Sequence, residues 1–224
     1  GALGAVVDLP EDLPARVTGP GIGDLAGVAE LGEPELAADG RVQVWLEAVR
    51  LLRRQFGDEI YVRGNCDQAP FSLASAVRGL DAWLLDLTEE ERWPQVEALL
   101  DYCARAGRQF IRLMAEAGAH MVSNGDSPAG PELISPGMYR KFALPWEKAL
   151  AEEAHAAGLP WLLHICGKTD RILAGMVESG ADAIELDYKT DVRLAREAFE
   201  GRAAFVGNID PSGVLALGTP RQVE

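Results

Sequence analysis

The stretch from residue 159 to residue 187 decides the fold of this chain, and it reads LPWLLHICGKTDRILAGMVESGADAIELD. Apolar runs predict strands at Trp161–Ile165 and Asp182–Leu186, and the pattern between them predicts a helix at Asp170–Ser179. Two neighbouring parallel strands need a crossover connection, which is usually a helix. The stretch therefore predicts a β-α-β unit within an α/β fold that has a parallel sheet.

The same alternation extends to both sides of this unit. Further strands are predicted at 60–64, 119–123 and 203–207. Further helices are predicted at 41–56, 94–117, 135–157 and 191–199, with a kink at Pro145 in the third and Thr190 as the cap of the last. Strands joined in this way indicate a parallel sheet that is closed into a barrel or covered by helices. A doubly wound open sheet is the structural alternative to a barrel.

The whole chain, residues 1–224, is predicted to form a single domain. A complete eightfold barrel typically needs about 250 residues, so we expect parts of a barrel to lie outside this chain. The chain opens within an apolar run, and the capping-box pattern from Thr219 to Gln222 announces a helix close to the last residue. We therefore expect missing structure at both ends, including a C-terminal strand and helix. Residues 8–40 are rich in proline, glycine and acids, so residues 1–40 are predicted to include a long surface loop or lid.

The composition excludes several classes of partner. The formal net charge is −14 and the isoelectric point is about 4.7, and an acidic surface repels phosphate backbones and anionic lipids. No apolar run approaches the about 20 residues of a membrane-spanning helix, and no basic leader precedes an apolar segment. The three cysteines lack the spacing of a disulfide framework. We expect a cytoplasmic protein that binds neither nucleic acid nor membranes; its oligomeric state stays open.

The segment His164-Ile165-Cys166-Gly167 is the sharpest chemical feature of the sequence. Alternate residues of a strand point the same way, so His164 and Cys166 present a nitrogen and a sulfur on one face at the carboxyl end of a strand. Imidazole and thiolate together suit zinc, and the helix that follows Thr169 favours the thiolate. Two ligands do not make a zinc site, and a packed histidine beside a buried cysteine is the alternative. Cys66 is the internal candidate for a third ligand, with a small apolar filler as its alternative reading.

Polar side chains also gather where the predicted strands end. Each could be a cap or a turn former, but together they are typical of a ligand site at the mouth of a barrel. These residues are Asn65 and Asp67, Asn124 and Asp126, Glu185 and Asp187, and Asn208 and Asp210.

Three blocks of sequence resemble the uroporphyrinogen decarboxylase superfamily. They are DSPAGPELISPGMY at Asp126–Tyr139, GNIDP at Gly207–Pro211 and APFSLA at Ala69–Ala74, where Ala69 replaces the usual glycine. The resemblance covers about residues 40–224, with the blocks in the expected order. It implies that the fold is a (β/α)8 TIM barrel.

The His-x-Cys-Gly segment further resembles the branch of that superfamily that contains the methylcobamide:thiol methyltransferases. This resemblance implies a zinc ion bound by His164, Cys166 and a cysteine beyond residue 224. It also implies methyl transfer from a methylated corrinoid, carried by a partner corrinoid protein, to a small thiol. Asp126 and Asp187 are the expected catalytic residues, and Asn65 and Asn208 are expected to bind the substrate.

Two other functions stay open at this point. In a metal-free uroporphyrinogen decarboxylase, acidic side chains would hold the pyrrole nitrogens while carbon dioxide leaves. A non-catalytic barrel that binds a corrinoid or a tetrapyrrole is the third reading.

Overall fold

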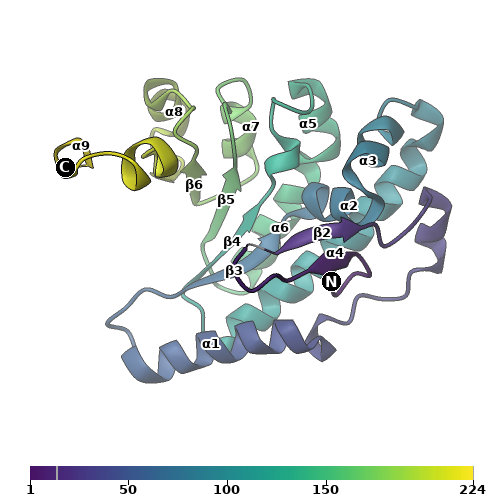
Figure 1. Cartoon of the computed structure of the whole chain (residues 1–224), viewed down its shortest axis with the longest axis horizontal. Helices are drawn as coiled ribbons and strands as arrows, with labels where there is room; N and C mark the ends of the chain where they lie inside the picture. Colours follow the sequence, from purple (N-terminus) through teal and green to yellow (C-terminus); the bar gives the residue numbers. More distant parts are fainter. Residues whose placement is uncertain (14, 224) are drawn as a thin grey trace.

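Five parallel strands form the central sheet, in the order in which they follow along the chain (Figure 1). The computed structural model describes residues 1–13 and 15–223. The strands are β3 (Arg63–Gln68), β4 (Met121–Gly125), β5 (Trp161–Ile165), β6 (Ala183–Leu186) and β7 (Ala204–Val206). Within the described residues, β3 and β7 are the two edges of this sheet. A doubly wound sheet reverses its strand order, so the sequential order favours the winding of a barrel over the open-sheet alternative.

The two faces of the sheet differ in character. On the face that packs against helices, Val122, Leu163 and Ile184 are fully buried. The register pairs Ser123 with Leu162 and Leu162 with Ala183, so these residues share the opposite face. We call this opposite face the lumen face; its polar members are Arg63, Asn65, Ser123, His164 and Glu185.

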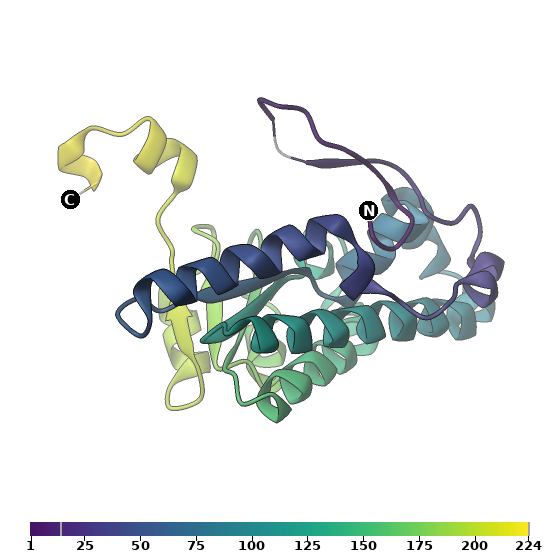
Figure 2. The ribbon, with the colours of Figure 1, turned by 90° about the horizontal axis from the view of Figure 1, so that it is seen from below.

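Long helices cover the apolar face of the sheet. α4 is the longest, with a buried stripe that includes Leu99, Cys103 and Ile111, and it packs between α1 and α6 (Figure 2). The helices are α1 (Gly40–Phe56), α2 (Pro70–Arg78), α3 (Leu80–Asp86), α4 (Trp93–Ala117), α5 (Pro136–Phe142), α6 (Leu144–Ala156), α7 (Leu173–Glu178), α8 (Val192–Phe199) and α9 (Pro220–Val223). Short helical turns are η1 (Leu25–Glu30), η2 (Leu36–Ala38), η3 (Glu90–Arg92), η4 (Ser127–Ala129) and the π-type turn η5 (Pro211–Ala216).

Three helix predictions need correction. The helix expected at Asp170–Ser179 is α7, which begins at Leu173, so no helix starts directly after Thr169 to favour the Cys166 thiolate. The helix expected at 135–157 is two helices, α5 and α6, which meet at Ala143; Ser135 caps the first, and Pro145 lies in the first turn of the second. The cap of α8 is Asp191, whose carboxylate accepts from the main-chain N–H of Arg193.

Strand positions also shift, and two helices were not predicted. β3 begins at Arg63 and β4 at Met121, each two or three residues later than expected. Asn65, Cys66 and Asp67 therefore belong to β3 and do not follow it. α2 and α3 occupy the segment directly after β3.

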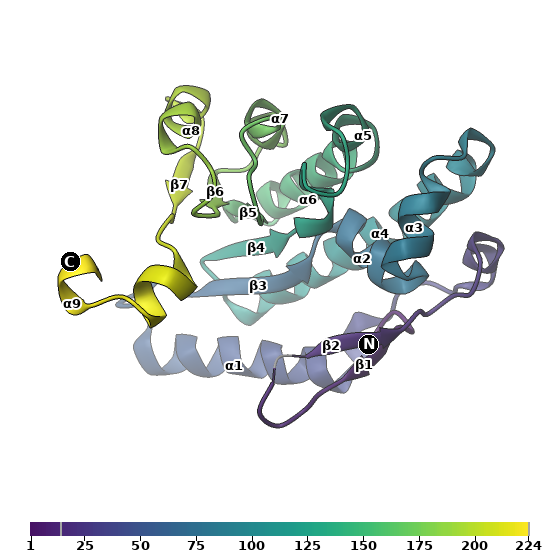
Figure 3. The same cartoon turned by 45° about the horizontal axis from the view of Figure 1, so that its top comes forward.

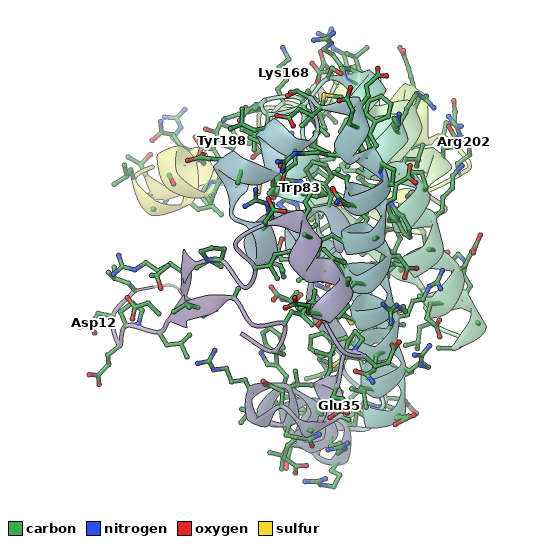
Figure 4. All side chains as sticks on the ribbon, turned by 90° about the vertical axis from the view of Figure 1, so that its right-hand side faces the viewer. Asp12, Glu35, Trp83, Lys168, Tyr188 and Arg202 are labelled. Carbon is green, nitrogen blue, oxygen red and sulfur yellow. The ribbon has the colours of Figure 1, made fainter. Side chains whose placement is uncertain are left out.

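The N-terminal region is not a plain loop. β1 (Val6–Asp8) and β2 (Arg16–Gly19) form an antiparallel hairpin (Figure 3), which stands away from the body of the protein (Figure 2). Asp12 marks its outer end (Figure 4). The turns η1 and η2 then anchor the chain to the core through the buried side chains of Leu25 and Leu36.

The Gln222 half of the predicted capping box at the other end is present. The side-chain oxygen of Gln222 accepts from the main-chain N–H of Thr219 at 2.9 Å, and α9 follows. Among the described residues, no helix has the length and apolar character that a membrane crossing requires.

Candidate functional site

His164 and Cys166 meet at the carboxyl end of β5. The Nε2 atom of His164 lies 3.0 Å from the Sγ atom of Cys166. The Nδ1 atom of the same ring lies 3.0 Å from the main-chain carbonyl of Glu185 on β6. A carbonyl only accepts, so Nδ1 carries the proton and donates, and this assigns the tautomer. The neighbouring strand therefore turns Nε2 toward the sulfur.

The contact between the two side chains shifts their pKa values toward each other. The hydrogen bond to Cys166 raises the pKa of His164, against the opposing effect of burial. The hydrogen bond from His164 lowers the pKa of Cys166, again against burial, and Ser127 adds to the lowering. Cys166 is exposed, so its sulfur lies at the open end of the strand and can be reached from solvent.

The pair fits the donor set of zinc. A neutral imidazole with Nδ1 bonded to a carbonyl and a thiol with a lowered pKa are what a zinc ion takes as ligands. No group of three or more His, Cys, Asp or Glu side chains within residues 1–13 and 15–223 is arranged to hold a metal ion. The structure thus brings together the two predicted ligands, and a third one beyond residue 224 stays a prediction.

Cys66 does not join this pair. It lies on the side of β3 that faces the helices, opposite to Asn65, and its sulfur donates to the main-chain carbonyl of Gly64. Burial raises the pKa of the Cys66 thiol well above its ordinary value. These properties match the apolar-filler reading of Cys66.

The loop after β5 is held in place by the loops after β4 and β6. The main-chain N–H of Cys166 donates to the hydroxyl of Ser127 at 3.3 Å. The N–H of Gly167 donates to the carboxylate of Asp187 at 2.8 Å, and Gly167 has φ +83°, which favours glycine. Asp187 also accepts from the N–H of Lys189. Burial acts to raise the pKa of Asp187, but these hydrogen bonds hold it below its ordinary value.

Asn208 continues this ring of contacts to the end of β7. Its side-chain amide donates to the main-chain carbonyls of Asp187 and Thr190, at 3.3 and 3.2 Å. Hydrogen bonds therefore connect the loops that carry Cys166, Asp187 and Asn208. Asp187 and Asn208 were both predicted site residues. In the structure, their recorded hydrogen bonds are to main-chain atoms.

Asp126 is placed differently from the other predicted site residues. It is fully buried, and its Oδ1 accepts from the main-chain N–H and the hydroxyl of Ser72 at the start of α2. Its own N–H donates to the carbonyl of His164 at 2.7 Å. The side chain of Asp126 is therefore buried below the carboxyl ends of the strands, whereas its main-chain N–H bonds to His164 in the site.

The sequence reading missed the carboxyl group that faces Asp126. Glu147 on α6 is also fully buried, and the hydroxyl of Tyr139 donates to its Oε2 at 2.6 Å. Oδ2 of Asp126 and Oε1 of Glu147 have no partner from a third described residue. A hydrogen bond between the two carboxyl groups requires a proton on one of them. Burial raises the pKa of Asp126 to about 6, and burial together with Asp126 raises that of Glu147. The sequence signal was the spacing: Glu147 falls three residues after Leu144 and three before Leu150, on the buried stripe of α6.

Comparison with known proteins places the chain in a family. The family model described as uroporphyrinogen decarboxylase (URO-D) matches residues 1–224. The chain belongs to the URO-D family. The predicted resemblance is confirmed, and the α/β fold class with it.

The URO-D relatives include enzymes of two kinds. A methylcobamide:CoM methyltransferase MtbA of Methanosarcina mazei is 39% identical over 185 residues, which is 83% of this chain and 53% of the relative. Its counterpart in Methanosarcina acetivorans is 37% identical, with the same two shares. A uroporphyrinogen decarboxylase of Thermus thermophilus is 31% identical and covers 81% of this chain and 52% of itself. The chain thus spans about half the length of these relatives.

A solved structure of the family supports the same placement. It is described as a methyltransferase from Methanosarcina mazei, and it matches with a TM-score of 0.84 at 26% sequence identity. The match covers 93% of this chain and 60% of that chain. The five-stranded sheet therefore corresponds to part of a larger fold of the URO-D family.

Proposed function

We propose that this chain carries the thiol-activating part of a methyltransferase that moves a methyl group from a methylated corrinoid to a thiol. The observation that carries the proposal is the pairing of His164 Nε2 with Cys166 Sγ at the open end of β5. The identity of 37–39% to proteins named methylcobamide:CoM methyltransferases supports the reaction class.

Zinc is the proposed metal, held by His164, Cys166 and a third ligand beyond residue 224. When bound, zinc lowers the pKa of a coordinated thiol, so that the thiolate is present at neutral pH. The part played by this chain is to hold the donors. The carbonyl of Glu185 fixes the imidazole, and Ser127 and Asp187 hold the main chain of Cys166 and Gly167.

The proposed partners follow from the reaction. The methyl donor is a methylated corrinoid presented by a corrinoid protein, and the acceptor is a small thiol. Because Cys166 is exposed, both can approach from the carboxyl ends of the strands. Asp187 and Asn208 are proposed to position the loops around the acceptor, and Asn65 to contact it from the lumen face.

Uroporphyrinogen decarboxylation is the second candidate, because decarboxylases of the family are about 31% identical over a similar share of the chain. The test is an assay of the full-length protein with methylcobalamin and thiols, beside an assay with uroporphyrinogen. Methyl transfer that needs zinc and is lost in Cys166→Ser is expected. Release of carbon dioxide by metal-free protein, with no methyl transfer, would favour the decarboxylase. Ligand binding without either turnover would favour a binding protein.

A further inference from the structure

A small polar cavity lies on the lumen face beside His164. Its volume is about 240 Å³, and its wall includes Arg63, Asn65, Asp67, Ser123 and Glu185. The wall is largely polar, with donors and acceptors that can orient a small polar ligand. It opens beside the imidazole that the proposed function assigns to the metal, which places it where the non-sulfur end of an acceptor thiol would lie.

The charges of the cavity are mixed. The guanidinium of Arg63 crosses from β3 to β6 and meets the carboxylate of Glu185 at 3.0 Å. That bond uses one N–H group of Arg63, and a guanidinium has five, so it can also take a carboxylate of a ligand. Asp67 adds a second carboxylate to the wall. The cavity wall thus carries two carboxylates and one guanidinium.

Ser123 gives an independent sign of a ligand. Its side chain is 2% exposed and lines the cavity, yet its hydroxyl oxygen has no hydrogen-bond partner among the described residues. A buried hydroxyl without a partner has lost its bonds to water without a replacement, so such groups usually have a partner. A polar group of a bound molecule in the cavity would supply it.

We propose that the cavity binds an acceptor thiol of the α-amino-acid class, with its carboxylate at Arg63 and its ammonium at Glu185 and Asp67. The inference rests on the proposed function. A purely anionic thiol could pair with Arg63 but would leave the carboxylates of Glu185 and Asp67 without a positive partner on the ligand. A zwitterionic thiol matches both signs of charge.

The test compares four acceptors with the full-length protein and methylcobalamin. Homocysteine is zwitterionic, 2-mercaptoethanesulfonate is anionic, cysteamine is cationic and 2-mercaptoethanol is neutral. We expect kcat/KM for homocysteine to exceed that for each of the others by about tenfold or more, because sites built to bond a polar group discriminate strongly against its absence. Equal use of all four thiols, or a preference for the sulfonate, would overturn the inference and leave the proposed function standing. Absence of transfer to every thiol would overturn both.

Variants of the cavity sharpen the test. In Arg63→Gln, the ratio of kcat/KM for homocysteine to that for 2-mercaptoethanol should fall about tenfold or more. In Glu185→Gln, the ratio of kcat/KM for cysteamine to kcat/KM for 2-mercaptoethanol should fall. Arg54→Gln is the matched control, because Arg54 is an exposed arginine of α1 that is likewise paired with a glutamate. Ratios that do not change in the cavity variants would contradict the inference.

Binding of methionine tests the same contacts without any catalytic turnover. Methionine carries the same charged groups as homocysteine with the sulfur already methylated. Calorimetric titration should show binding of methionine to the wild-type protein and to Arg54→Gln, and about tenfold weaker binding to Arg63→Gln. Equal affinity in Arg63→Gln would place the carboxylate elsewhere and overturn the proposed contact.

Discussion

The Nε2 atom of His164 lies 3.0 Å from the Sγ atom of Cys166, although the two residues project from a strand end with no third ligand beside them in the described residues. The imidazole is turned toward the sulfur by a hydrogen bond from its other nitrogen to β6. The ligand pair is therefore formed by the sheet itself.

Cys166 should react at lower pH than an ordinary thiol. The hydrogen bond from His164 lowers the pKa of Cys166. In metal-free protein, the pKa of this thiol should therefore lie below that of free cysteine, which is about 8.5. The measurement is the alkylation rate of metal-free protein against pH. The pH at the midpoint of the alkylation curve should be higher in His164→Ala than in the wild-type protein. A midpoint at or above that of free cysteine in the wild-type protein would contradict the assigned hydrogen bond. The other two cysteines are buried and should react only after unfolding.

Replacing Cys66 separates a ligand from a packing residue. Cys66→Ala removes a buried sulfur from the core, and we expect a loss of about 1 kcal/mol in the free energy of unfolding. Zinc content should stay at the wild-type level. Denaturant unfolding and metal analysis of the same sample measure both. Loss of zinc in a variant that remains folded would restore Cys66 as a ligand.

The buried pair of Asp126 and Glu147 should make stability fall as pH rises. Both pKa values are raised by folding, so the folded protein holds more protons than the unfolded chain. Their stabilising effect is complete below the ordinary carboxyl pKa and is lost as pH rises through the folded-state values, which for Asp126 means from about 4 to about 6. Glu147→Gln should flatten this dependence and raise the melting temperature at pH 8 relative to the wild type.

The control for that prediction lies on the same helix. Glu152→Gln changes an exposed carboxylate of α6, so it should keep the wild-type dependence of melting temperature on pH. Melting curves between pH 4 and pH 8 for the three proteins make the comparison. An unchanged pH dependence in Glu147→Gln would show that the pair carries no extra proton.

Gly167 should be required for the site as well as for stability. Its φ of +83° strains any side chain, and a Cβ atom would lie 2.8 Å from the carboxyl carbon of Glu132. Gly167→Ala should cost about 1–3 kcal/mol of unfolding free energy and weaken zinc binding. Gly137→Ala is the control, because a Cβ atom there meets its nearest neighbour at 3.8 Å. Equal stability of the two variants would show that the loop after β5 tolerates a side chain.

The repeating part of the fold could be predicted because its strands are short apolar runs and its helices carry regular buried stripes. Trp161–Ile165 was placed to the residue for this reason. The hairpin of β1 and β2 could not, since Val6 and Val17 are about half exposed and give no alternation of buried and exposed positions. Its few residues pair through main-chain atoms, which the sequence does not display.

The site could be predicted only where its geometry is local. His164 and Cys166 are two residues apart on one strand, so their common direction follows from the strand itself. The burial of Asp126 depends on Ser72, which lies 54 residues away on another element. Glu147 was missed for the same reason, because its partner Asp126 comes from a distant turn. Such contacts appear only once the sheet and helices are assembled.

Zinc content of the purified full-length protein tests the central claim most directly, when it is measured beside His164→Ala and Cys166→Ser. We predict about one zinc ion per chain in the wild-type protein and loss of that zinc in both variants, with their far-UV circular dichroism unchanged. Absence of zinc from the wild-type protein after reconstitution under reducing conditions would contradict the account. It would leave the His164–Cys166 contact as packing and make the metal-free decarboxylase the leading function.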